Sequence, residues 1–324
     1  MEEIRWGIIG CGDVTEVKSG PAFNKVANSK LVAVMRRDGA KAADYAKRHN
    51  VPKWYNDASK LINDPEVNAI YIATPPLQHE AYTIEALQAG KPVYVEKPMT
   101  LDAAAAQRMK DAASQFNVKL SVAHYRRAQP MFLRVKELLA NNTIGDIRLV
   151  RLKMLQPPNP ALIAKTDDNW RINPAISGGG LFHDLAPHQL DLMTYYFGAV
   201  KNAMGIATRQ QQNTEVDDLV TGNILFENGI VFSGSWCFSV APQDQADNCV
   251  IYGSAGHISF PMFGNKITVT TSQTKEYVFE PLQHVQQPMI EKVVDYFLGK
   301  GENPCSGEDA LITMKLMDDF TTNK

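Results

Sequence analysis

The sequence predicts an α/β Rossmann domain with a doubly wound parallel sheet, followed by an α+β domain with a large, mostly antiparallel sheet. Over the first 122 residues, short apolar runs alternate with helix-like segments, and a glycine turn follows the first run. Beyond residue 146, β-like runs dominate, and Asn228-Gly229 between two of them is a strong hairpin signal. At 324 residues, the chain is too long for one typical core. We therefore predict a nucleotide-binding domain over 1–122 and a substrate-binding and oligomerisation domain over 123–324.

Composition excludes several classes of partner and site. The formal net charge is −2 and no basic block is present, so we expect no nucleic-acid binding. The four cysteines are scattered, without C-x-x-C spacing, so we expect neither a metal site nor a disulfide framework. No segment has the length and apolarity of a membrane span, and the start lacks the pattern of a signal peptide. We expect a cytoplasmic protein without a membrane partner.

The first predicted strand, 4–9, runs directly into a glycine turn. The turn residues are Gly10, Cys11, Gly12, Asp13 and Val14. The first glycine permits the tight turn, and the second allows the backbone to approach the pyrophosphate of a dinucleotide. Thr15 stands where the fingerprint usually has its third glycine, and a G-x-G alone is equally compatible with a plain turn.

The tip of the second strand, 31–35, predicts which dinucleotide binds. It carries Arg36, Arg37 and Asp38 before a helix over 40–48. An acidic residue at this place accepts hydrogen bonds from the adenosine ribose of NAD, whereas arginines accommodate the 2′-phosphate of NADP. We prefer NADP, with Arg36 on the phosphate and Arg37 over the adenine. NAD remains open through Asp38, and a solvated charged turn is the plain alternative.

The next two strands end in polar turns at the same edge of the predicted sheet. The strand 69–73 ends in Thr74-Pro75-Pro76, and the strand that begins at Val93 ends in Glu96-Lys97-Pro98. Ligands bind beyond the carboxyl ends of parallel strands, so these turns line the predicted crevice. Helices are predicted over 79–88 and 101–116, and a last strand over 119–122 completes the domain.

One helix interrupts the β-rich second half. It follows three glycines, 178–180, and carries Asp184 and His188 four residues apart, on one helical face. By spacing alone, such a pair is more often a surface contact. The remaining predicted elements are helices over 130–141, 289–298 and 306–320, and strands over 147–155, 202–209, 219–226, 230–240 and 249–252.

Taken in order, these motifs resemble those of the Gfo/Idh/MocA family, the relatives of glucose-fructose oxidoreductase and inositol dehydrogenase. The resemblance covers essentially the whole chain, and the segment A-G-K-x-V-x-x-E-K-P, 89–98, is its most specific part. It implies that Lys97 contacts both nicotinamide and substrate, and that the Lys97-Pro98 bond is cis. The other cofactor-binding residues that it implies are Thr74, Pro75, His79 and Glu96. Pro76 departs from the family's usual Asn.

In the second half, the resemblance makes Asp184 and His188 active-site groups. It also implies that Tyr125 and Arg126, in the segment His124-Tyr125-Arg126-Arg127, face the substrate, although arginines that cover a domain seam are an equal alternative. Trp170 and Arg171 resemble the segment that walls the substrate pocket.

These residues predict a reversible hydride transfer between NADP(H) and a carbinol carbon of a sugar, polyol or dihydrodiol. His188 acts as general base, Asp184 orients it, and Lys97 stabilises the developing alkoxide. In the alternative assignment, Lys97 transfers the proton and His188 binds the substrate oxygen. A glycosidase of the same fold that uses NAD and a nucleotide-binding regulatory protein are the alternatives. We expect a homodimer or homotetramer formed through the outer face of the C-terminal sheet.

Overall fold

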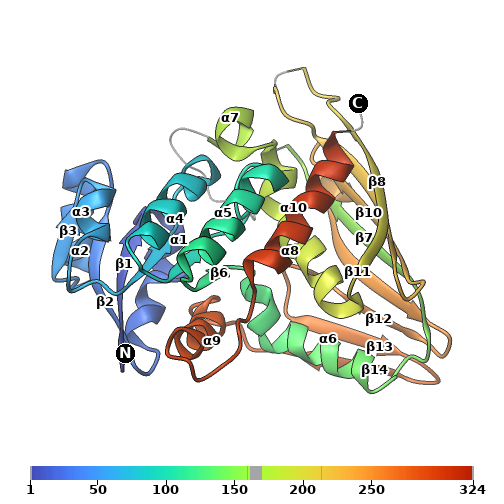
Figure 1. The fold of residues 1–324 in the computed structure, drawn as a ribbon. Helices are drawn as coiled ribbons and strands as arrows, with labels where there is room; N and C mark the ends of the chain where they lie inside the picture. The colour runs from blue at the N-terminus through green and yellow to red at the C-terminus, as the bar shows by residue number, and fades with distance from the viewer. Residues whose placement is uncertain (1, 159, 161–169, 213, 323–324) are drawn as a thin grey trace. The chain divides into compact units, whose positions relative to one another are not determined.

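The computed structural model describes residues 2–158, 160, 170–212 and 214–322. The chain divides into two compact units (Figure 1). The first consists of Met1–Gln129 and Leu282–Leu311, and the second of Pro130–Pro281 and Ile312–Lys324. This division differs from the predicted boundary, because the segment 282–311 belongs to the first unit rather than to the second.

The first unit contains a six-stranded parallel sheet with the order β3-β2-β1-β4-β5-β6. This is the strand order of a dinucleotide-binding fold. Its central strands are almost wholly buried, as expected when helices cover both faces of a sheet. The strands are β1 (Ile4–Ile9), β2 (Ser29–Met35), β3 (Lys53–Tyr55), β4 (Ala69–Ile72), β5 (Val93–Val95) and β6 (Leu120–Val122).

Three helices of this unit, α2, α3 and α5, begin at side-chain caps. Asp38, Asp57 and Asp102 each accept a hydrogen bond from the main-chain amide three residues later, which satisfies one of the free donors at a helix start. The helices are α1 (Asp13–Val17), α2 (Gly39–Arg48), α3 (Ala58–Ile62), α4 (His79–Gln88), α5 (Ala103–Phe116) and α9 (Gln287–Phe297).

Helix α9 explains why the late segment joins the first unit. Lys119 Nζ donates to the carbonyl of Tyr296 at 2.6 Å, and the ring of Phe297 lies 5.6 Å from that of Trp6 in β1. Further along, the amide of Val122 in β6 donates to the carbonyl of Cys305 at 3.0 Å. An amphipathic helix read from sequence does not reveal which sheet will cover its apolar side.

The second unit contains an eight-stranded sheet with the order β14-β13-β12-β11-β7-β10-β9-β8. All neighbours pair antiparallel except β7 and β10, which are parallel. The predicted hairpin is confirmed, because Gly229 has φ +85° between β9 and β10. The strands are β7 (Ile147–Leu155), β8 (Val200–Thr208), β9 (Leu219–Phe226), β10 (Val231–Cys237), β11 (Ala246–Gly253), β12 (His257–Phe260), β13 (Lys266–Thr270) and β14 (Thr274–Val278).

Helices cover one face of this sheet (Figure 1). A Cβ atom added at Gly222 in β9 would lie 2.3 Å from the ring of Phe320, and one added at Gly205 in β8 would lie 2.6 Å from its Cα, so these two glycines make room for the end of α10. The opposite face is more open, with Met204 and Ile206 of β8 exposed. The helices are α6 (Pro130–Ala140), α7 (Pro174–Ser177), α8 (Gly180–Phe197) and α10 (Gly307–Thr321), the last of which begins in the first unit.

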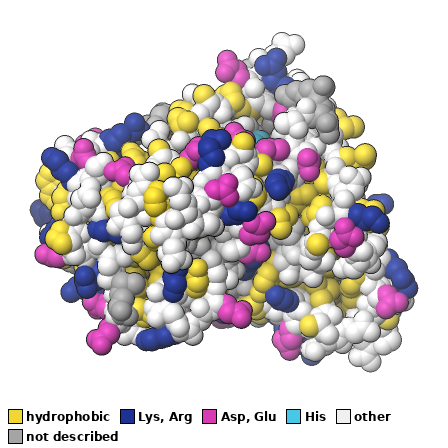
Figure 2. All heavy atoms as spheres, in the orientation of Figure 1, with side chains coloured by type: hydrophobic (Ala, Val, Ile, Leu, Met, Phe, Trp, Pro, Cys, Tyr) yellow, Lys and Arg dark blue, Asp and Glu magenta, His cyan; other side chains and the backbone are white. Residues whose placement is uncertain are grey.

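The predicted fold class is therefore confirmed, with one parallel and one mostly antiparallel sheet. Among the described residues, no helix is long and apolar enough to cross a membrane. Figure 2 shows Lys and Arg side chains interspersed with Asp and Glu over the visible face.

Candidate active site

The glycine turn leaves β1 as the sequence predicts. Gly10 has φ +94°, and a Cβ atom there would lie 2.7 Å from the amide nitrogen of Thr74, so only glycine fits. At Gly12, by contrast, an added Cβ would meet no described atom closer than 4.0 Å. The turn therefore packs against β4 on one side and leaves its backbone approachable at Gly12.

The tip of β2 places an arginine against this turn. Arg36 Nη1 donates to the carbonyl of Cys11 at 3.3 Å, whereas Arg37 is exposed. Asp38 caps α2 by accepting from the amide of Lys41 at 3.1 Å. The first residue after β2 is thus a cation beside the glycine turn, and the nearby carboxylate has a structural role.

His79 joins two of the predicted turns. Its Nε2 lies 2.7 Å from the carbonyl of Thr74, and its Nδ1 lies 3.0 Å from the carbonyl of Pro98. The ring is fully buried, and burial lowers the pKa of His79. A neutral imidazole has one N–H, so it donates to one carbonyl at a time. His79 therefore ties the end of β4 to the turn that carries Lys97; its predicted contact with the cofactor stays a prediction.

The turn after β5 is anchored by a buried carboxylate. Glu96 is 5% exposed, and its Oε1 accepts from the hydroxyl of Tyr71 at 2.5 Å and from Nε2 of Gln286 at 2.6 Å. Its Oε2 accepts from the amide of Lys97 at 3.2 Å. Burial, and next the negative charge of Glu96, raises the pKa of Tyr71 well above its usual range. The Lys97-Pro98 bond is cis, as predicted, and Lys97 is half-buried.

The residues at this edge fit a dinucleotide. The hydroxyl of Thr74 is buried and has no hydrogen-bond partner among the described residues, so it is available to a ligand. Together with the open side of Gly12 and the guanidinium of Arg36, it provides a backbone approach, a hydroxyl and a cation. Gly10, Gly12, Thr74 and Arg36 are therefore the residues that would hold the pyrophosphate and adenosine ends.

Helix α8 carries the predicted groups of the second unit. Gly180 has φ +74°, and a Cβ atom there would lie 2.6 Å from Val216. The ring of His183 packs directly over Gly179. Burial lowers the pKa of His183 to about 4, against a smaller opposing effect of the Gly179 backbone and the Asp217 carboxylate. His183 is therefore neutral at pH 7.

Three of the predicted residues form one cluster in this unit. Arg171 Nε donates to Oδ2 of Asp184 at 2.9 Å, and the guanidinium lies 4.6 Å from the ring centroid of Trp170. The two charged side chains are 12% and 16% exposed, so the pair is largely desolvated. The sequence assigned Arg171 to the substrate wall; the structure gives it a contact with the predicted catalytic carboxylate.

His188 lies on the same helix and is 4% exposed. Its ring centroid lies 6.2 Å from that of Phe263 in an edge contact. Tyr125 and Arg126 are buried and lie in the 3-10 turn Tyr125–Ala128 of the first unit. The guanidinium carbon of Arg126 lies 5.7 Å from the centroid of the Tyr125 ring. The predicted residues thus fall into one group on the first unit and one on the second, on α8 and the 3-10 turn Trp170–Ile172.

Comparison with known proteins identifies the family. Residues 4–124 match the model described as an oxidoreductase family with an NAD-binding Rossmann fold, and residues 132–259 match the GFO/IDH/MocA C-terminal domain. The chain belongs to the Gfo/Idh/MocA oxidoreductase family. It is therefore an enzyme with an NAD-binding fold.

Similar family members include a protein named as an oxidoreductase from Formosa agariphila, 50% identical over 98% of both chains. The trans-1,2-dihydrobenzene-1,2-diol dehydrogenase of Bos taurus is 30% identical over 86% of this chain and 81% of its own. Among solved structures, levoglucosan dehydrogenase in complex with NADH and levoglucosan has a TM-score of 0.85 and 21% identity, covering 98% of this chain and 96% of that one. The last comparison supports the fold.

The family motifs alone do not point to Tyr71 and Gln286, which hold Glu96. Tyr71 belongs to an apolar run that reads as plain core, and Gln286 is 190 residues away from Glu96. No spacing rule connects them. A buried strand residue that carries a hydroxyl was the one available signal, since a buried tyrosine usually has a hydrogen-bond partner.

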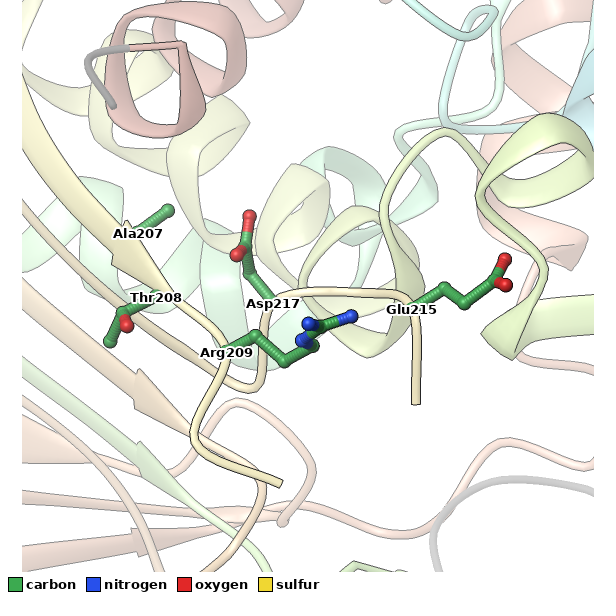
Figure 3. Close-up of a pocket in the computed structure, with 5 residues that line it drawn as sticks. All are labelled: Ala207, Thr208, Arg209, Glu215 and Asp217. Carbon is green, nitrogen blue, oxygen red and sulfur yellow. The ribbon is translucent and has the colours of Figure 1, made fainter. Parts of the chain in front are cut away.

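A cavity of about 320 Å³ lies in the second unit (Figure 3). It is lined at the end of β8 and the connection to β9 by Ala207, Thr208, Arg209, Glu215 and Asp217. None of these described lining residues was predicted for the active site. The family motifs therefore do not account for this cavity.

Proposed function

We propose that the protein is an NADP-dependent dehydrogenase that oxidises a ring-borne secondary alcohol of a sugar, polyol or dihydrodiol, and reduces the corresponding carbonyl in reverse. The observation that carries the substrate class is the similarity to the bovine trans-1,2-dihydrobenzene-1,2-diol dehydrogenase over four-fifths of that enzyme. A dihydrodiol and a cyclic sugar share a secondary carbinol next to another hydroxyl group. The family's substrate pockets distinguish them by shape rather than by motif.

The preference for NADP rests on the tip of β2. Arg36 is the first residue after the strand, and its guanidinium reaches the glycine turn at Cys11. Asp38, the acidic residue that would select NAD, is engaged as the cap of α2. A guanidinium binds a phosphate monoester by charge-assisted hydrogen bonds. These are stronger than the hydrogen bonds that it makes to the uncharged hydroxyl of an adenosine ribose.

The protein's residues have three tasks in the proposed reaction. The bound nicotinamide supplies the hydride chemistry. Lys97 donates a hydrogen bond to the substrate oxygen and stabilises its negative charge. His188 takes the hydroxyl proton during oxidation and returns it during reduction. Asp184, paired with Arg171, supports the orientation of His188. With the roles of Lys97 and His188 exchanged, the lysine handles the proton and the imidazole binds the oxygen.

A spectrophotometric screen tests the reaction. The purified protein is offered NADP⁺ or NAD⁺ with trans-1,2-dihydrobenzene-1,2-diol, aldoses and cyclic polyols, and NADPH or NADH with the matching carbonyls. We expect turnover with NADP⁺ on at least one vicinal diol. Cleavage of a glycoside without net cofactor reduction would identify the glycosidase instead. Tight NADPH binding without any turnover would favour a regulatory protein.

Replacement of Arg36 tests the cofactor preference. Arg36→Asp should reverse it, lowering kcat/KM for NADP⁺ about 10–100-fold, because a charged hydrogen bond is worth about 1.5–3 kcal/mol. The matched control is Arg37→Asp at the exposed neighbour. An unchanged ratio of NADP⁺ to NAD⁺ efficiencies in Arg36→Asp would overturn the assignment to Arg36.

We further propose that two copies associate through the outer face of the second sheet. Val231 is paired with Leu225 on one side and Leu149 on the other, and Leu149 is paired with Tyr252, so an apolar row crosses four strands. Ile206 of β8 is paired with Thr221 of β9 and is 67% exposed. Light scattering should show a dimer or tetramer that Ile206→Asp weakens, with Leu133→Asp on α6 as control. A monomeric wild type at micromolar concentration contradicts it.

A further inference from the structure

The segment just before α9 contacts the chain downstream of the glycine turn. Lys25 Nζ donates to the side-chain oxygen of Gln283 at 3.0 Å, and Nδ1 of His284 lies 2.6 Å from the carbonyl of Val17. The amide of Gln286 donates to the carbonyl of Lys18 at 3.2 Å. Val17 is the last residue of α1, so this segment fixes the far end of the helix that the glycine turn begins.

The side chain of Gln286 extends from this segment to the other predicted turn. Its Nε2 donates to Oε1 of Glu96 at 2.6 Å, and its own Oε1 accepts from the hydroxyl of Tyr94 at 3.4 Å. Gln286 is 1% exposed. Both ends of its amide group are therefore used, and the contacts hold it in one orientation.

Loss of this contact leaves a buried carboxylate with fewer donors. Glu96 receives hydrogen bonds from Tyr71, Gln286 and the amide of Lys97. A buried carboxylate that loses a donor moves towards another donor or towards water. Since Oε2 of Glu96 holds the main-chain amide of Lys97, a shift of the carboxylate changes the position of the Lys97 turn.

We propose that Gln286 is a positioning residue for Lys97. Its main chain fixes the end of α1, and its side chain fixes Glu96, so one residue sets the spacing between the glycine turn and the lysine turn. The inference rests on the proposed role of Lys97 in the reaction. It assigns a function to a residue that lies far from Lys97 in the sequence.

The test compares Gln286→Met with Gln287→Met. Methionine retains the volume of glutamine but neither donates to Glu96 nor accepts well from Tyr94. The control removes the same group from the next residue, which is half-buried. We expect Gln286→Met to lower kcat about 10–30-fold, the loss that one charged hydrogen bond predicts. The Kd for NADPH, measured by fluorescence titration, should change less than about threefold, which is below the effect of one charged hydrogen bond.

A second readout needs neither cofactor nor substrate. The rate at which Lys97 is acetylated by acetic anhydride in the native apoprotein is followed by mass spectrometry of its peptide. We expect at least a threefold change in Gln286→Met and none in Gln287→Met. Loss of thermal stability with unchanged kcat and unchanged Lys97 acetylation would show a merely structural glutamine and overturn the inference. If Gln286→Met does not fold, Tyr94→Phe gives the same test with a smaller expected change in the same direction.

The double variant separates this inference from the proposed function. If Gln286 acts through Lys97, Gln286→Met adds no further loss of kcat in a Lys97→Met background. A full additional loss overturns the positioning role while the role of Lys97 stands. Near-normal turnover of Lys97→Met alone overturns the proposed role of Lys97, and the inference fails with it, while the dehydrogenase activity stands.

Discussion

The two groups of predicted catalytic residues are held in different ways. Around Lys97, buried hydrogen bonds converge on Glu96 from elements far apart in sequence, and His79 ties two turns together through main-chain carbonyls. Around Asp184, an ion pair connects α8 to Arg171, 13 residues upstream. The first arrangement depends on contacts between distant parts of its unit, and the second on a pair of largely buried charges that lie close in sequence. Substitutions should therefore act differently in the two groups.

The largest effect is expected at Lys97. Lys97→Met should lower kcat about 10³-fold, the upper range for a lost donor to a developing oxyanion. Steady-state kinetics with the best substrate of the screen measure it. Lys91→Met is the matched control, because Lys91 is a partly buried lysine of the same unit that donates to the carbonyl of Asp64. Turnover of Lys97→Met within a few-fold of the wild type would remove Lys97 from the site.

At His188 we expect a loss of about 10²-fold in kcat for His188→Gln, the lower range for a missing acid–base group. Glutamine retains the capacity for polar contacts, but its side chain does not take up and release a proton as an imidazole does. The pH profile of kcat/KM should lose one of its limbs, and His257→Gln on β12 serves as control. Full activity of His188→Gln would assign the proton to Lys97 and keep the imidazole as an oxygen ligand at most.

His183 provides the pH test of α8. Burial lowers its pKa to about 4. As the pH falls, the unfolded chain takes up the proton first, near its ordinary pKa of about 6.5, so the folded protein loses stability between about pH 6.5 and 4. The loss reaches about 2 kcal/mol at about pH 5. His183→Gln should lack this component in urea unfolding at pH 7.5 and 5. Equal losses in variant and wild type would show that His183 does not titrate on unfolding.

The smallest effect is expected at Arg171. Arg171→Ala removes the ion pair with Asp184 and should lower kcat about tenfold, because a partly buried pair contributes on the order of 1–2 kcal/mol. Arg171→Lys keeps the charge but not the forked geometry and should lie between alanine and wild type. A larger loss than that of His188→Gln would mean that Arg171 itself contacts the substrate, as the sequence alone suggested.

The fold and the separate motifs were accessible from the sequence because each depends on local patterns. The strand β1, the helix α4 and the hairpin at Gly229 follow from periodicity and turn residues. The roles of Gln286, Tyr71 and Arg171 were not accessible, since each is defined by a partner that only the tertiary fold supplies. The short strand β3 and the helix α3 were also missed, because three and five residues are too few for a period to emerge.

The first unit is discontinuous in sequence, and this has a consequence for dissecting the enzyme. A fragment that ends at residue 129 would lack the carbonyl of Cys305 that pairs with β6, and the hydrogen bond that Gln286 donates to Glu96. Gln129 Nε2 donates to the carbonyl of Val285 at 3.1 Å, so the two stretches meet there. A minimal nucleotide-binding protein should therefore be made as one polypeptide in which a short glycine-rich linker splices 1–129 to 282–311.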